Sequence, residues 1–154
     1  MNVRLLDILR CPKTGSVLTI EGGVDASGEV DSGFLFSDDG SCRYPIIRGI
    51  PRFVAQSNYA DSFGMQWNRF AGTQLDSHSG HGISAARFWK STRWDAAEMN
   101  GKWTLDGGCG SGRFAEVALS SGAQVVAIDL SSAVDACRRN LGHHPNLHVV
   151  QASL

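Results

Sequence analysis

A cluster of glycines follows an acidic residue in the second half of the chain. Asp106 ends a short apolar run, and glycines then occupy alternate positions, Gly108, Gly110 and Gly112, before a helical pattern begins. Glycine has no side chain, so a ligand can lie directly against the backbone there. The free amides at the start of the following helix receive the polar groups of such a ligand. The spacing therefore predicts a cofactor site where a strand turns into a helix.

A second acidic residue, Asp129, ends the next apolar run, and its carboxylate could accept hydrogen bonds from both hydroxyls of a ribose. Dinucleotide-binding proteins carry G-x-G-x-x-G/A in a similar place, and residues 110–115 fit that pattern formally. Read from Gly108 the pattern fails, because Arg113 holds the last glycine position. The form with alternate glycines uses one more glycine and also accounts for Asp106, so we prefer it to an NAD(P) site.

The segment W-T-L-D-G-G-C-G-S-G-R-F, residues 103–114, resembles the first motif of class I S-adenosylmethionine (SAM)-dependent methyltransferases, strand-D-x-G-x-G-x-G-helix. The resemblance implies S-adenosyl-L-methionine as cofactor, with its methionine end against the glycines and its amino group near Asp106. It also implies that Asp129 holds the ribose and that Leu130 packs on the adenine. Ser153 stands where this family commonly carries an acid near the adenine amino group, so that contact is not expected here.

From Trp103 onward, strand and helix patterns alternate. We expect strands at 103–106, 124–129 and 147–151. Helices are expected at about 112–120 and from after a Ser131 cap to near Gly142. The resemblance implies a seven-stranded Rossmann-like parallel sheet, of which residues 103–154 supply the N-terminal half. We therefore expect an α/β fold cut after its third strand, whether by natural truncation, a fragmentary gene sequence or an artificial boundary.

Such a cut has consequences for activity and association. The side that binds the methyl acceptor would be missing, so no catalytic residue is assigned and the chain alone is expected to be inactive. An unpaired sheet edge would also favour a dimer or aggregate.

The first block, residues 1–56, reads as a small β-rich domain with strands near 17–20 and 33–36. Pro45 and Pro51 cannot donate to a sheet, so the segment around them is expected to be an edge or a turn-rich extension. The stretches L-L-D-I-L-R-C-P and Y-P-I-I-R-G-I-P are similar to a zinc-ribbon-like family that activates methyltransferases as a subunit or as a fused domain.

The metal positions of that family are degenerate here. Cys11 matches the first ligand, whereas Cys42 falls outside the pattern; the other ligand positions hold Thr14, Ser37 and Gly40. One thiolate cannot complete a tetrahedral zinc site, so we expect no metal. His78 and His81 have H-x-x-H spacing, but we expect them in a solvated loop without an acidic ligand.

Residues 57–102 read as a helical connecting arm. The aromatic residues Tyr59, Phe63, Trp67 and Phe70 recur at helical spacing, which favours a helix packed on the core. The alternative is a lid over the SAM pocket. Ser84 and Asp95 are candidate N-caps of two further short helices.

Composition limits the classes of function. The chain has 154 residues and a net charge of −1, so a general electrostatic grip on nucleic acid is not indicated. It carries no apolar run of membrane-spanning length and no signal peptide, which predicts a cytoplasmic protein with four reduced cysteines. The expected partner is a small-molecule methyl acceptor. A non-catalytic module that docks a methyltransferase partner remains the alternative function.

Overall fold

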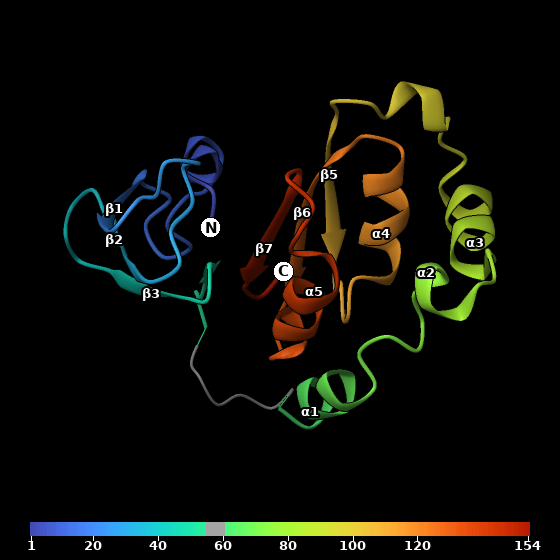
Figure 1. Cartoon of the computed structure of the whole chain (residues 1–154). Helices are drawn as coiled ribbons and strands as arrows, with labels where there is room; N and C mark the ends of the chain where they lie inside the picture. Colours follow the sequence, from blue (N-terminus) through green and yellow to red (C-terminus); the bar gives the residue numbers. More distant parts are fainter. Residues whose placement is uncertain (55–60) are drawn as a thin grey trace.

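The structure is a computed structural model that describes residues 1–54 and 61–154. The chain begins with a short 3-10 helix, Val3–Asp7, and an antiparallel sheet follows it (Figure 1). The sheet has the order β1-β2-β3-β4, with bounds Leu18–Gly22, Gly33–Ser37, Arg43–Ile47 and Ile50–Pro51. These elements form the N-terminal unit, whose antiparallel sheet agrees with the β-rich character predicted for this part of the chain.

The expectation that the proline segment is an edge is wrong for β3, which pairs with both β2 and β4. Pro45 lies opposite Phe34, and its carbonyl accepts a hydrogen bond from the Arg52 amide at 2.9 Å. The nitrogen and carbonyl of one strand residue point to the same side, so the missing donor of Pro45 faces β4. Since β4 has only two residues, an interior strand tolerates proline here.

The middle of the chain is helical, with bounds α1 Asp61–Arg69, α2 Asp76–Ser79, α3 Ile83–Thr92 and a 3-10 turn at Ala96–Glu98. Asp95 caps that turn as predicted, because its side chain accepts from the Ala97 amide at 2.9 Å. Ser84 is not a cap but lies buried inside α3. The carboxylate of Asp76 instead accepts from the amides of Ser84 and Ala85, so α2 caps α3 from outside.

Residues 103–154 form the predicted alternation of strands and helices, here called the C-terminal unit. The three strands are parallel in the order β5-β6-β7; the bounds are β5 Trp103–Gly107, α4 Arg113–Ser120, β6 Gln124–Asp129, α5 Ala133–Leu141 and β7 Leu147–Gln151. The strands agree closely with the sequence prediction. An antiparallel sheet followed by this parallel sheet fits a partial Rossmann-like fold.

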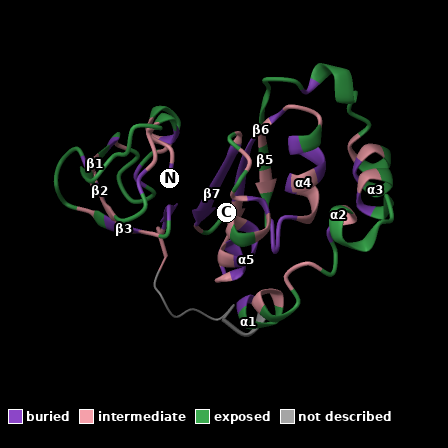
Figure 2. Ribbon diagram, in the orientation of Figure 1, coloured by how far each residue is buried: buried purple, intermediate pink, exposed green. Residues whose placement is uncertain are grey.

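The parallel sheet is covered on both faces. Side chains of Val125 and Val149 pack with the helices, whereas Val126 and Val150 pack with the core of the N-terminal unit. Consecutive residues of a strand point to opposite faces, so one strand serves two cores. Figure 2 shows the result, with β7 buried between the N-terminal unit and the rest of the C-terminal unit.

The two edges of this sheet differ. At β7, the amide of Phe53 donates to the carbonyl of Gln151 at 2.8 Å, so the N-terminal unit extends the sheet. Within the described residues β5 pairs with β6 alone, and it exposes Trp103 and Leu105. Association through this edge stays a prediction. None of the helices in the described ranges has the length and apolar character needed to cross a membrane.

The shared core predicts that both units unfold together. Leu35 is fully buried in β2, in the same cluster as Val126 and Val150. Leu35→Ala should lower the free energy of unfolding by about 2–5 kcal/mol. In urea, far-ultraviolet circular dichroism and tryptophan fluorescence should shift together; the four tryptophans all lie outside the N-terminal unit. Val24→Ala, at a side chain 50% exposed, is the control. Separate transitions for the two signals would contradict a shared core.

Candidate cofactor site

The glycine loop connects β5 to α4 at the carboxyl end of the parallel sheet. Its amides are tied to the neighbouring strand, because Gly108 and Cys109 both donate to the carbonyl of Ile128, at 2.8 and 2.9 Å. All three alternate glycines have positive φ, a conformation that glycine adopts without strain. The chain thus turns sharply between β5 and α4 while remaining bonded to β6, which keeps the loop in one place.

The glycines serve different purposes. Gly112 has φ 98°, and a Cβ there would lie 2.7 Å from Leu141 and 3.1 Å from the Cys137 sulfur. Packing against α5 therefore requires glycine at this position. At Gly108, φ is 77° but a Cβ would have nothing within 4 Å. Gly108 therefore leaves open space beside the backbone, as approach of a ligand requires.

Asp129 closes the loop from the end of β6. One carboxylate oxygen accepts from the Gly110 amide at 3.0 Å, and the other accepts from the amide and hydroxyl of Ser131 at 2.8 and 2.7 Å. Asp129, which is predicted to bind the ribose, thus also stabilises the glycine loop and the turn before α5. The N-cap residue of α5 is Ser132 rather than the predicted Ser131, although the Ser131 hydroxyl accepts from the Ala133 amide at 3.2 Å.

Asp106 lies across from Asp129, and one of its carboxylate oxygens is enclosed without a hydrogen-bond partner. Burial raises the pKa of this carboxyl above its usual value; the Ala115 amide lowers that pKa and the charge of Asp129 raises it. A carboxylate kept in this state is stabilised by a cationic or hydrogen-bonding ligand. The Asp106 carboxylate is therefore suited to accept a hydrogen bond from an amino group.

Cys109 lies within the glycine loop and is buried there. It is 5% exposed, and its thiol points toward the Gly110 carbonyl at 3.7 Å. Contact with the Cys137 thiol and burial raise the pKa of the Cys109 thiol well above its usual value. Because the thiolate is the reactive form of cysteine, both observations agree with a packing role.

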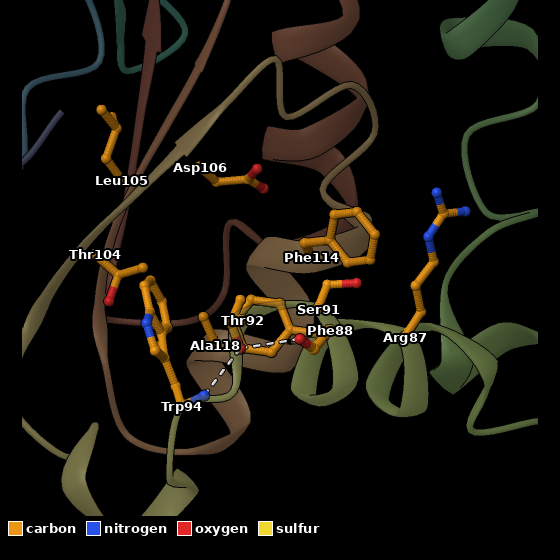
Figure 3. A pocket seen from close by; sticks show the side chains of 10 residues that line it. All are labelled: Arg87, Phe88, Ser91, Thr92, Trp94, Thr104, Leu105, Asp106, Phe114 and Ala118. Atoms are coloured by element: carbon orange, nitrogen blue, oxygen red, sulfur yellow. Dashed lines mark hydrogen bonds between the residues drawn. The ribbon is translucent and has the colours of Figure 1, made fainter.

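A cavity of about 260 Å³ lies between the two aspartates. Of the predicted residues, Gly108 and Gly110 line it together with the two aspartates, whereas Gly112 and Leu130 do not. Residues that were not among the predicted site residues also line it: Trp67, Gln74, Arg87, Ser111 and Arg113. An adjoining cavity of about 300 Å³, drawn in Figure 3, shares Asp106, Arg87 and Phe114 with it and adds Phe88 and Trp94. In Figure 3, Asp106 and Leu105 leave β5 in opposite directions, and Asp106 extends toward the side of Phe114 and Arg87.

Trp67 bears on both interpretations of the aromatic arm, as a helix packed on the core and as a lid. A Cβ on Gly110 would lie 3.4 Å from the Trp67 ring, so this indole lies against the glycine loop. The same helix also packs on α5, where the Asn68 side chain donates to the Ser132 carbonyl at 2.8 Å. Phe70 is 51% exposed, so the stripe is not a simple buried face. Tyr59 and the side chain of Phe63 lie outside the described residues.

The structure places other predicted residues away from this site. His78 belongs to α2 rather than to a loop. In the N-terminal unit the Cys11 sulfur lies 3.2 Å from the Tyr44 hydroxyl. Among the residues that the structure describes, no three histidine, cysteine, aspartate or glutamate side chains are grouped to hold a metal. Leu130 directly follows Asp129, as the sequence requires, and its carbonyl accepts from the Gln151 side chain at 3.0 Å.

Replacing glycine by alanine should lower the free energy of unfolding by different amounts at different positions. Gly112→Ala combines an unfavourable φ with contacts to Leu141 and Cys137, so unfolding free energy should fall by about 3 kcal/mol or more. Gly15→Ala is the matched control, because Gly15 has φ 71° and no atom within 4 Å of its Cβ position. Its loss should be about 1–2 kcal/mol. Equal losses by urea denaturation would show that packing on α5 does not select glycine.

Comparison with known proteins agrees with this geometry. Residues 105–154, from β5 through the glycine loop to β7, match the family model of a methyltransferase domain. A search of curated proteins gave no significant match. The family match, together with the parallel sheet and its glycine loop, supports a class I SAM-dependent methyltransferase domain in this part of the chain.

Proposed function

We propose that the cavity between Asp106 and Asp129 binds SAM, and that the protein serves methyl transfer to a small-molecule acceptor. The observation that carries this proposal is the enclosed, unpartnered oxygen of Asp106, beside the open backbone at Gly108. The amino group of the methionine portion of SAM would donate to the Asp106 oxygen. The rest of the methionine portion would lie against the open backbone at Gly108. Cytoplasmic location stays a prediction of the sequence.

The residues of the cavity suit the parts of SAM. The free oxygen of Asp106 accepts from the amino group of the methionine portion. Asp129 already holds the Gly110 amide and Ser131, yet a carboxylate has about four acceptor positions, so ribose hydroxyls can be added. Arg87 lines both cavities and is suited to receive a carboxylate.

The methyl group is supplied by the sulfonium of SAM, which makes the cofactor the activated partner. The protein then has to align the acceptor and exclude water. The indole of Trp67 contributes to the second task, because it lies against Gly110 at the side of the cavity. In this proposal the aromatic arm acts both as a packed helix and as a cover.

Isothermal titration with S-adenosylhomocysteine tests the proposal directly. The chain should bind this product, whereas NAD should not bind. Asp129→Asn should weaken binding by about 1–3 kcal/mol, since a charged hydrogen-bond acceptor is lost. Gly108→Ala should abolish most of the binding while leaving the thermal midpoint close to that of Gly15→Ala, because its Cβ meets only open space in the free protein. Binding of NAD without S-adenosylhomocysteine would refute the proposal.

The raised pKa of Asp106 predicts a pH dependence. A protonated carboxyl loses its attraction for an ammonium group, so affinity for S-adenosylhomocysteine should fall as the pH drops through the pKa of Asp106. Since that pKa lies above the ordinary value of about 3.9, the fall should begin at a higher pH than an exposed aspartate would give. Titrations from about pH 8 to about pH 4 measure it. Asp106→Asn should bind weakly and lose this dependence.

A further inference from the structure

Arg52 joins the two units of the protein at the end of β4. Its backbone is held in place, because its amide donates to Pro45 and the next amide, of Phe53, donates to Gln151. The side chain of Arg52 is 11% exposed. One guanidinium nitrogen donates to the Gln151 side-chain oxygen at 2.7 Å, and the other donates to Asp135 at 2.8 Å. The guanidinium thus spans two groups of the C-terminal unit.

Gln151 carries one of these contacts onward. It is 3% exposed and ends β7, and its side-chain amide nitrogen donates to the Leu130 carbonyl at 3.0 Å. The side-chain oxygen of Gln151 therefore accepts from Arg52 of the N-terminal unit. The side-chain nitrogen of Gln151 donates to the residue that follows Asp129. A buried amide that loses its partner is costly, so removal of Arg52 would favour rearrangement of Gln151.

Asp135 carries the other contact. It lies in the first turn of α5, where a negative charge is favourable, and 17% of its side chain is exposed. The two contacts of Arg52 therefore reach the two ends of one segment, residues 130–135. This segment contains Leu130 and leads from Asp129 into α5. Arg48 also approaches Asp135, at 3.9 Å, but its side chain is 75% exposed.

We propose that Arg52 is a positioning residue for the adenosine side of the cofactor site. From the N-terminal unit it holds the segment 130–135 through Gln151 and Asp135, and so sets the place of Leu130 beside the ribose ligand Asp129. This inference rests on the proposed function, because SAM binding is what makes that segment the adenosine side. It gives the N-terminal unit a direct part in cofactor affinity.

Hydrogen exchange measured on the full chain tests the positioning step without any ligand. The amide of Ser131 donates to the Asp129 carboxylate and that of Ala133 to the Ser131 hydroxyl, so both report the order of the segment. In Arg52→Met these two amides should exchange about tenfold faster, the scale expected for loss of a charged hydrogen bond. The amides of Gly108 and Cys109, bonded to Ile128, should be unchanged. Arg48→Met, which removes the exposed arginine near the same aspartate, should leave all four unchanged.

Gln151→Glu provides a second variant if Arg52→Met folds poorly. Glutamate keeps an acceptor for Arg52 but has no donor for the Leu130 carbonyl, so the segment should again exchange faster. Arg52→Lys keeps the charge but cannot span both partners, so it should restore only part of the protection. Unchanged exchange at Ser131 and Ala133 in both Arg52→Met and Gln151→Glu would overturn the inference. Equally faster exchange in the glycine loop would also overturn it, since a general loss of stability would then explain the result.

Titration with S-adenosylhomocysteine completes the test. Affinity should fall about tenfold in Arg52→Met and not in Arg48→Met. Faster exchange with unchanged affinity would overturn the positioning role. If the unaltered chain binds no S-adenosylhomocysteine, the proposed function fails, and the exchange experiment still decides whether Arg52 orders the segment.

Discussion

Burial of both faces of the parallel sheet is the constraint on which the structure depends. Parallel strands are stable where helices or other layers cover each face, and β6 and β7 alternate their side chains between two cores. Helices α4 and α5 provide one cover, and α3 packs on α4. The other cover is the N-terminal unit, whose 3-10 helix contributes Leu5 and whose antiparallel sheet contributes Leu35 and Ile46 to a core shared with Val126 and Val150. The N-terminal unit is thus a structural layer of the domain that carries the cofactor site.

The buried sheet also fixes the positions of the residues in the candidate site. Strands β5 and β6 are hydrogen-bonded in register, with Asp106 opposite Ala127, so both aspartates arrive at the same end of the sheet. The amides of the glycine loop then bond to Ile128 and Asp129, the last residues of β6. A loop that contains so much glycine would lose considerable conformational entropy on folding. Its attachment to a strand buried on both faces offsets that loss and keeps the cavity open.

The parallel sheet could be predicted from the sequence because its strands are short apolar runs that end in polar or glycine residues. The grouping of Asp106, Gly108, Gly110 and Asp129 around one cavity could be predicted for a similar reason, since each residue lies at or just after the end of a predicted strand. Their role in binding a cofactor stays a prediction. The parts that could not be predicted depend on contacts between distant residues. Asp76 rather than Ser84 caps α3, because the Asp76 carboxylate accepts hydrogen bonds from the first amides of that helix. Pro45 lies inside a sheet because its partner strand ends after two residues. Nothing in the local pattern around Arg52 indicates Gln151, which lies 99 residues later.

The state of Cys109 has a chemical consequence for the proposed complex. A sulfonium such as SAM is an alkylating agent, and a thiolate is among the strongest nucleophiles in proteins. A small residue is needed in the loop, and cysteine fills that position with its sulfur buried against Cys137 and turned toward a carbonyl. Because its pKa is raised, the thiol keeps its proton at neutral pH. The Cys109 thiol is thereby kept unreactive toward the cofactor that the loop is proposed to hold.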